Sequence, residues 1–81
     1  MTKTFIHIGN GYRVAKQHLR SIDPTGSEPT RREIQEFRKN NRLTDATKGR
    51  KARSLVTTTC GHAYLSMLTV ETIENRADSD T

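Results

Sequence analysis

The sequence predicts a small α+β protein with a mostly antiparallel sheet, one central helix and a short carboxy-terminal helix. Two hairpin signals and one amphipathic segment support this prediction. With 81 residues, of which only 31% are hydrophobic, the chain can form one domain but can bury little apolar surface. We therefore expect a single domain over residues 1–77, a disordered acidic tail at 78–81, and association of the domain with copies of itself.

The first hairpin is predicted from the alternating strand at residues 5–8 and from the turn at 9–11. The turn contains an Asn-Gly pair, which is the strongest short-range signal for a tight hairpin. The second strand region extends from Tyr12 to about Ile22. Because its apolar positions change phase near Lys16 and Gln17, we expect a bulge or a break there.

The central helix follows a run of turn-forming residues at 23–27. It is predicted to begin near Pro29 and to end at Asn40 or Asn41, while Thr30 and Glu33 have the capping-box spacing of an alternative start. At 100° per residue, the stripe expected to face the core is Thr30, Ile34, Phe37 and Asn41. A row of arginines lies beside it: Arg31, Arg38 and Arg42. Cations in the first helical turn oppose the helix dipole, which is a hint of binding; a solvated charged face is the alternative.

The remaining elements are a short strand at residues 43–47, a second hairpin and the terminal helix. Residues 53–58 and 63–68 are predicted to be the arms of that hairpin, and Thr69 is the expected N-cap of the helix. All four aromatic residues fit core positions: Phe5, Tyr12, Phe37 and Tyr64. A stacking platform for single-stranded nucleic acid is therefore not expected.

The positive charge is concentrated in one part of the chain. Residues 1–53 hold thirteen basic and five acidic residues, whereas 54–81 hold one basic and four acidic ones. The densest cluster is Lys48, Arg50, Lys51 and Arg53 around Gly49. Arginine presents a planar fork to phosphate oxygens, and glycine allows a sharp turn. We expect this segment to contact a polyanion, of which nucleic acid is the commonest; charge that only keeps the protein soluble is the alternative.

Other function classes find little support in the sequence. Cys60 is the single cysteine, and no long apolar run is present, so a soluble cytoplasmic protein is expected. Cys60 and His62 lie in one turn, and two such ligands do not make a tetrahedral metal set. No acidic partner of fitting spacing completes a catalytic group. We therefore predict neither an enzyme nor a metal or cofactor site.

Four segments together resemble the RemA family of small bacterial regulators. They are residues 5–11, the helix start with Pro29 and Arg32, residues 45–53, and residues 65–73. The resemblance covers nearly the whole chain, and its most specific part is Asp-Ala-Thr-x-Gly-Arg at 45–50. It implies a transcriptional activator of the kind first associated with biofilm matrix genes. It also implies a ring-shaped homo-oligomer whose basic loops face double-stranded DNA.

The resemblance assigns candidate roles residue by residue. Arg50 matches a family DNA contact, and Lys51 stands where the family usually has a second arginine. His18 stands where an arginine is common, and Lys48 replaces a usual tyrosine. The candidate DNA-binding residues are therefore Arg50, Lys51, Lys48, Arg53, His18 and Arg31. An RNA-binding module and a protein-interaction ring with an acidic partner are the alternatives.

Overall fold

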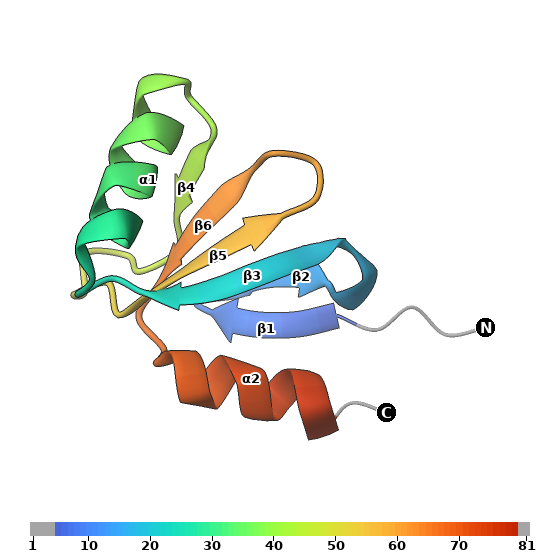
Figure 1. The fold of residues 1–81 in the computed structure, drawn as a ribbon. Coiled ribbons are helices and arrows are strands. Elements are labelled where there is room, and N and C mark those ends of the chain that lie inside the picture. Colours follow the sequence, from blue (N-terminus) through green and yellow to red (C-terminus); the bar gives the residue numbers. More distant parts are fainter. Residues whose placement is uncertain (1–4, 80–81) are drawn as a thin grey trace.

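The chain folds into two small sheets and two helices. The computed structural model describes residues 5–79. In chain order the elements are β1 (Phe5–Gly9), β2 (Tyr12–Ala15), the 3₁₀ turn η1 (Lys16–His18), β3 (Leu19–Pro24), α1 (Glu28–Lys39), β4 (Leu43–Asp45), β5 (Ser54–Thr58), β6 (Ala63–Ser66) and α2 (Val70–Ser79). Strands β1 and β2 form one sheet, and the other four strands form a second with the order β3-β5-β6-β4 (Figure 1). The α+β class is thus confirmed, with two sheets in place of one.

The first hairpin and the break after it are confirmed. Strands β1 and β2 pair antiparallel, and the turn between them holds Asn10 at φ 54° and Gly11 at φ 85°. Two successive positive φ angles are the geometry that favours Asn-Gly in hairpins. The change of phase in the apolar pattern near Lys16 corresponds to η1, which separates β2 from β3. The predicted second strand is therefore two strands that belong to different sheets.

The four-stranded sheet is antiparallel except at one edge. Strand β5 pairs antiparallel with both β3 and β6, whereas β4 pairs parallel with β6. The predicted hairpin of β5 and β6 is confirmed. The parallel pairing follows from the path of the chain, because β4 leaves α1 at the far side of β6 and a long loop returns the chain to β5 (Figure 1).

The molecule has three layers, with the four-stranded sheet in the middle. Strand β5 is buried on both faces. On one face, Leu55, Ala63 and Leu65 pack against α1 through Ile34 and Phe37. On the other face lies the second apolar cluster, made of Ile6, Ile8, Val14, Ala46, Val56 and Ile73 from the first hairpin, the sheet, its loop and α2. Each cluster is small, so each layer contributes only a thin core.

The prediction that Phe5 is a core residue is wrong. Its side chain is 39% exposed, because β1 directs Ile6 and Ile8 into the core and places Phe5 and His7 on the outer face. The guanidinium of Arg13 lies 5.1 Å from the centroid of the Phe5 ring. This is a cation–π contact at the surface.

Helix α1 begins and ends where the sequence predicted, with Pro29 in its first turn and Asn40 as its C-cap. Its N-cap is Ser27 rather than Thr30, and the two hydroxyl oxygens lie 2.7 Å apart. Thr30 is buried and Phe37 is half-buried, but Asn41 is exposed with φ 57°. Asn41 therefore terminates the helix in the left-handed conformation that asparagine tolerates, and its place in the predicted core stripe is wrong.

Helix α2 begins at its expected cap. The Thr72 backbone N–H donates to the Thr69 hydroxyl over 3.2 Å, as an N-cap requires. The helix extends to Ser79, whereas the sequence predicted an acidic tail from residue 78. Residues 80 and 81 lie outside the described part of the chain.

Candidate nucleic-acid interface

The basic loop, defined as residues 48–53, begins with a tight turn. The Arg50 N–H donates to the carbonyl of Thr47 over 3.1 Å, and Lys48 and Gly49 have φ angles of 52° and 86°. A Cβ atom added at Gly49 would meet nothing within 4 Å. The glycine is therefore required by the backbone conformation and not by lack of space.

A carboxylate fixes the start of the loop. Asp45, the last residue of β4, accepts hydrogen bonds from the Thr47 backbone N–H at 2.9 Å and from the Thr47 hydroxyl. These two bonds, with a smaller contribution from the positive charge of Arg38, hold the pKa of the Asp45 carboxyl below its usual range. Because Thr47 is also buried, the first residue of the turn has one fixed position.

The turn of the first hairpin also holds the loop. The Asn10 side-chain amide donates to the carbonyl of Ala46 over 2.8 Å. On the other side, the Ala46 N–H donates to the carbonyl of Leu65 in β6 over 2.9 Å. Ala46 itself is fully buried. The turn of the first hairpin and strand β6 thus both hold Ala46, two residues before the loop.

The end of the loop is bonded to β6 and to the turn between β3 and α1. The Arg53 N–H donates to the carbonyl of Ser66 over 2.8 Å. The Thr25 hydroxyl donates to the Ala52 carbonyl over 2.9 Å, and its backbone N–H donates to the carbonyl of Arg53 over 3.3 Å. The loop is therefore a short exposed arch on a fixed base.

The cations of the loop stand outside this base. The side chains of Lys48, Arg50, Lys51 and Arg53 are all exposed, whereas Ala52 is half-buried against the α1 cluster. Arg31 is also exposed in the first turn of α1, and its backbone N–H donates to the carbonyl of Ser27, two residues beyond Thr25. Five of the six candidate residues thus lie at one end of the molecule.

His18 lies at the other end. It closes η1 and its carbonyl accepts a bond from the N–H of Thr59, next to the pair formed by Leu19 and Thr58. The loop joins the opposite end of the same ladder, where Pro24 pairs with Ser54. Five strand residues at about 3.3 Å each separate these ends by about 17 Å. One copy of the chain therefore does not bring His18 together with the basic loop.

Of the three arginines predicted to form a row on the helix, Arg31 and Arg38 lie on α1, whereas Arg42 lies beyond its end. Arg38 contributes its charge to Asp45, and Nη1 of Arg42 lies 3.6 Å from the point where a side chain on Gly61 would begin. Gly61 is in the turn between β5 and β6. The arginine edge therefore connects the loop end of α1 with the tip of the second hairpin and does not converge on the loop.

The cysteine and histidine of the second hairpin are engaged in local contacts. The Cys60 sulfur lies 3.0 Å from the Thr58 hydroxyl, which, with the His62 backbone and the charge of Arg42, lowers the pKa of the Cys60 thiol. Nε2 of His62 lies 2.6 Å from the Thr44 hydroxyl, and its ring packs edge-on against Tyr64. Within residues 5–79, no three His, Cys, Asp or Glu side chains are grouped as a metal site.

No helix in this part of the chain has the length and apolarity to cross a membrane.

The residues that position the loop were not found from the sequence. Asn10 bonds Ala46, two residues before the loop and 36 positions away, and Thr25 bonds Ala52 in the loop, 27 positions away. Asparagine and threonine are common in turns because their side chains bond the nearby backbone. Their presence in these two turns therefore gave no signal of a distant partner. Asn10, Asp45 and Thr47 lie inside segments that the resemblance marked, whereas Thr25 lies outside all of them.

Fold and loop define this chain as a small α+β protein that presents a preorganised cationic turn. The RemA-like family, described as extracellular matrix regulatory protein A-like, matches residues 5–77. Relatives from Bacillus cytotoxicus, Bacillus mycoides and Bacillus cereus are 38% identical over 79 residues, which cover 98% of this chain and 91% of theirs. Each of these relatives is named "Putative regulatory protein". The chain belongs to the RemA-like family.

Proposed function

We propose that this protein is a DNA-binding transcriptional regulator that contacts the duplex backbone through the basic loop, in the cytoplasm. The description of its family and the names of its relatives support a regulatory role. The observation that carries the DNA contact is the loop itself. Its exposed cations project from a base held by bonds to three other segments of the chain: the turn of the first hairpin, the turn between β3 and α1, and β6.

Phosphate is the chemistry that this loop fits best. Arg50 offers a bidentate fork, and Lys48 and Lys51 offer movable ammonium groups on either side of it. The turn fixes the backbone, so little conformational freedom remains to be lost when a phosphate binds. A contact to phosphates carries no sequence information by itself. Specificity would come from the deformability of the bound duplex, as in a DNA that is bent or wrapped.

A homo-oligomer would multiply the contact. One loop makes few phosphate contacts and binds weakly, whereas linked copies raise the overall affinity by about 10²–10⁴ without a new type of contact. In this proposal the oligomer is a ring that repeats the loop around one rim. A ring would also let His18 of one copy act near the loop of another, although the two lie far apart in a single chain.

The direct test is fluorescence anisotropy with a labelled duplex of about 30 base pairs at low salt. Arg50→Ala removes one charge-assisted contact of about 1.5–3 kcal/mol per copy, which corresponds to a loss of about tenfold or more in affinity. Lys39→Ala is the control, because Lys39 is exposed at the far end of α1 and its loss changes the net charge equally. We expect Lys39→Ala to bind within about twofold of the wild type. Equal affinities for Arg50→Ala and wild type would contradict the proposal.

The salt dependence of the same measurement identifies the partner. The logarithm of the binding constant should fall with a slope of about 0.9 per neutralised phosphate, and Arg50→Ala should reduce that slope. A flat response would indicate a contact that does not involve phosphates. Structured RNA, added as a competitor, should displace the duplex no better than unlabelled DNA. Stronger competition by RNA would replace DNA with RNA as the partner.

A further inference from the structure

The turn of the first hairpin carries the one side-chain amide that bonds a distant segment within residues 5–79. Nδ2 of Asn10 donates to the carbonyl of Ala46 over 2.8 Å and lies 3.8 Å from the sulfur of Met67. Ala46 is fully buried, and its carbonyl accepts no other bond from the described residues. The Asn10 amide is therefore the donor that satisfies this buried carbonyl.

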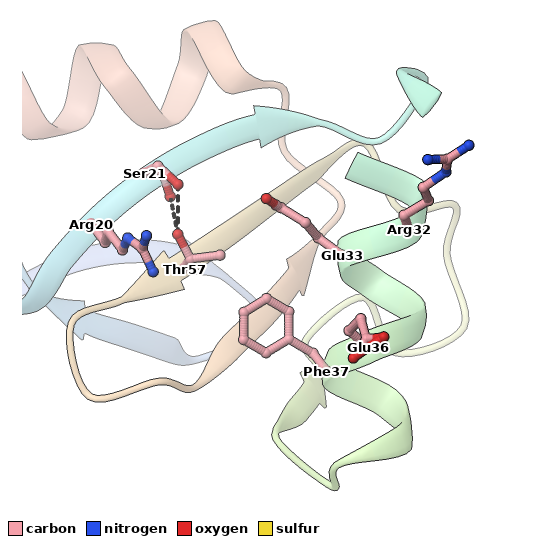
Figure 2. Close-up of a pocket in the computed structure, with 7 residues that line it drawn as sticks. All are labelled: Arg20, Ser21, Arg32, Glu33, Glu36, Phe37 and Thr57. Atoms are coloured by element: carbon pink, nitrogen blue, oxygen red, sulfur yellow. Dashed lines mark hydrogen bonds between the residues drawn. The ribbon is translucent and has the colours of Figure 1, made fainter. Parts of the chain in front are cut away.

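This bond differs in its chemistry from the side-chain bond that joins β3 to β5. Ser21 and Thr57, in the wall of the groove of about 330 Å³ drawn in Figure 2, are joined through hydroxyl oxygens 2.6 Å apart. A hydroxyl has no group that water replaces under mild conditions. A side-chain amide of asparagine, in contrast, is converted to a carboxylate with loss of ammonia. The bond from Asn10 is therefore one that a slow reaction in water can break.

The residue that follows Asn10 favours this reaction. Gly11 has no side chain to shield its backbone nitrogen, and no atom lies within 4 Å of the point where a side chain would begin. The Gly11 N–H also forms no hydrogen bond in the part of the chain that the structure describes. Its nitrogen is thus free to attack the side-chain carbonyl carbon of Asn10, since the two atoms close a five-membered ring.

We propose that Asn10 is a modification site, at which hydrolysis of the side-chain amide releases the base of the basic loop. In the first step the Gly11 nitrogen bonds to the side-chain carbonyl carbon and gives up its proton, and ammonia leaves as the ring closes. In the second step one water molecule opens the ring and leaves an aspartate, or its β-linked isomer, at this position. The sum is amide plus water to acid plus ammonia. Water is the only co-reactant, and nothing is oxidised or reduced.

The product reverses the interaction at Ala46. A carboxylate only accepts hydrogen bonds, so it repels the carbonyl that the amide held. The buried carbonyl is then without a donor, which destabilises the closed base. Thr47 follows Ala46 directly, and its carbonyl accepts the N–H of Arg50 over 3.1 Å. Opening of the base therefore exposes the Arg50 N–H to hydrogen exchange with solvent.

The site is tested by mass spectrometry of the full chain after prolonged incubation at mildly alkaline pH. Trypsin releases residues 4–13 as one peptide, in which Asn10 is the only side-chain amide. Residues 40–42 form a second peptide with Asn41, which is exposed at φ 57°, close to the 54° of Asn10, but precedes Arg42. We expect the mass gain of amide hydrolysis to appear several-fold faster in the first peptide. An equal or slower gain in residues 4–13 would overturn the assignment.

Release of the loop base is tested with Asn10→Asp, which introduces the carboxylate directly. Asn41→Asp is the matched control, because it makes the same change of charge in the same backbone conformation, and the Asn41 side chain has no hydrogen bond within residues 5–79. Hydrogen exchange of the Arg50 N–H should be about fivefold faster or more in Asn10→Asp and unchanged in Asn41→Asp. Unchanged exchange in Asn10→Asp would overturn the release. Equal acceleration of the β5 amides would also overturn it, because the whole domain would then be destabilised.

The consequence for DNA rests on the proposed function and is measured separately, in the anisotropy assay. Asn10→Asp should bind the duplex about fivefold more weakly than the wild type, and Asn41→Asp within about twofold. If Arg50→Ala weakens binding and Asn10→Asp does not, control of the loop through Asn10 is overturned. If Arg50→Ala also keeps the wild-type affinity, the proposed function fails, and the exchange of the Arg50 N–H alone decides the inference.

Discussion

The substitution Gly49→Ala tests whether the shape of the basic loop, and not only its charge, matters for binding. Gly49 has φ 86°, and an added Cβ would meet no atom within 4 Å. The substitution therefore removes no charge and causes no clash. Its cost is the left-handed conformation, about 1–2 kcal/mol for a residue with a side chain. The smaller unfolded-state entropy of alanine offsets about 0.4–1 kcal/mol of this. A net loss of about 1 kcal/mol is expected.

This free-energy cost can appear either in the stability of the domain or in its affinity for the duplex. If the bonds from Thr25, Asn10 and Ser66 hold the turn, the strain lowers the stability of the whole domain. A domain of this size then loses about 4–8 °C in Tm for each kcal/mol. If the turn relaxes instead, Tm is kept and the cations change position, so duplex affinity falls by about fivefold or more per copy. A fall in Tm would show that the turn keeps its conformation under strain, and a fall in affinity would show that this conformation is used in binding.

A matched control comes from the chain itself. Gly26, in the turn before α1, also has open space around it, but it does not have a positive φ of this kind. Gly26→Ala should therefore leave the affinity unchanged and raise Tm slightly, because only the unfolded-state effect remains. The assays are thermal unfolding by circular dichroism and anisotropy with the labelled duplex. The reasoning is refuted if Gly49→Ala matches Gly26→Ala in both measurements.

Two further predictions concern charge. Lys51→Arg restores the fork that the family resemblance places there, and it should strengthen duplex binding about threefold or more in the anisotropy assay, while Lys39→Arg should not; equal gains in both would show that the position is not a contact. The pKa of Asp45 is lowered in the folded state, so its carboxylate contributes stability that is present above the unfolded pKa of about 4 and is lost as the pH falls through the folded value. Tm measured from pH 6 to pH 2 should therefore fall less steeply below pH 4 in Asp45→Asn than in the wild type, and parallel curves would contradict the role of the Thr47 bonds.

Local signals in the sequence were sufficient for most of the elements. The Asn10-Gly11 turn, the break at η1 and the cap at Thr69 each depend on residues within about five positions, and each is confirmed. The position of Phe5 required a choice between two faces of β1. Its neighbours Ile6 and Ile8 are both apolar, and alternation assigns Phe5 to the face of His7. Because three of the first four residues of the strand are apolar, all of them looked suited to the core.

Features that depend on distant partners could not be predicted. The parallel pairing of Leu43 with Ala63 joins two neighbouring strands that are twenty residues apart in the sequence, with β5 between them along the chain. The candidate loop was found from its charge, but its fixed base was not. Likewise, nothing in the sequence showed that His18 and Arg50 lie near opposite ends of one ladder, because β3 and β5 pair residues that are 30 to 39 positions apart. Their separation is a property of the sheet register.

The fixed base explains how so small a protein can present a binding loop at all. A free loop would lose about 1–2 kcal/mol of backbone entropy for each residue ordered on binding. Here Asn10, Thr25 and Asp45 supply bonds that order the ends of the arch before any partner arrives. The ordering cost is thereby part of folding, where the two core clusters offset it. Affinity for a polyanion in this design depends on the integrity of the whole fold, so a substitution in the core, far from any cation, weakens binding through the loop.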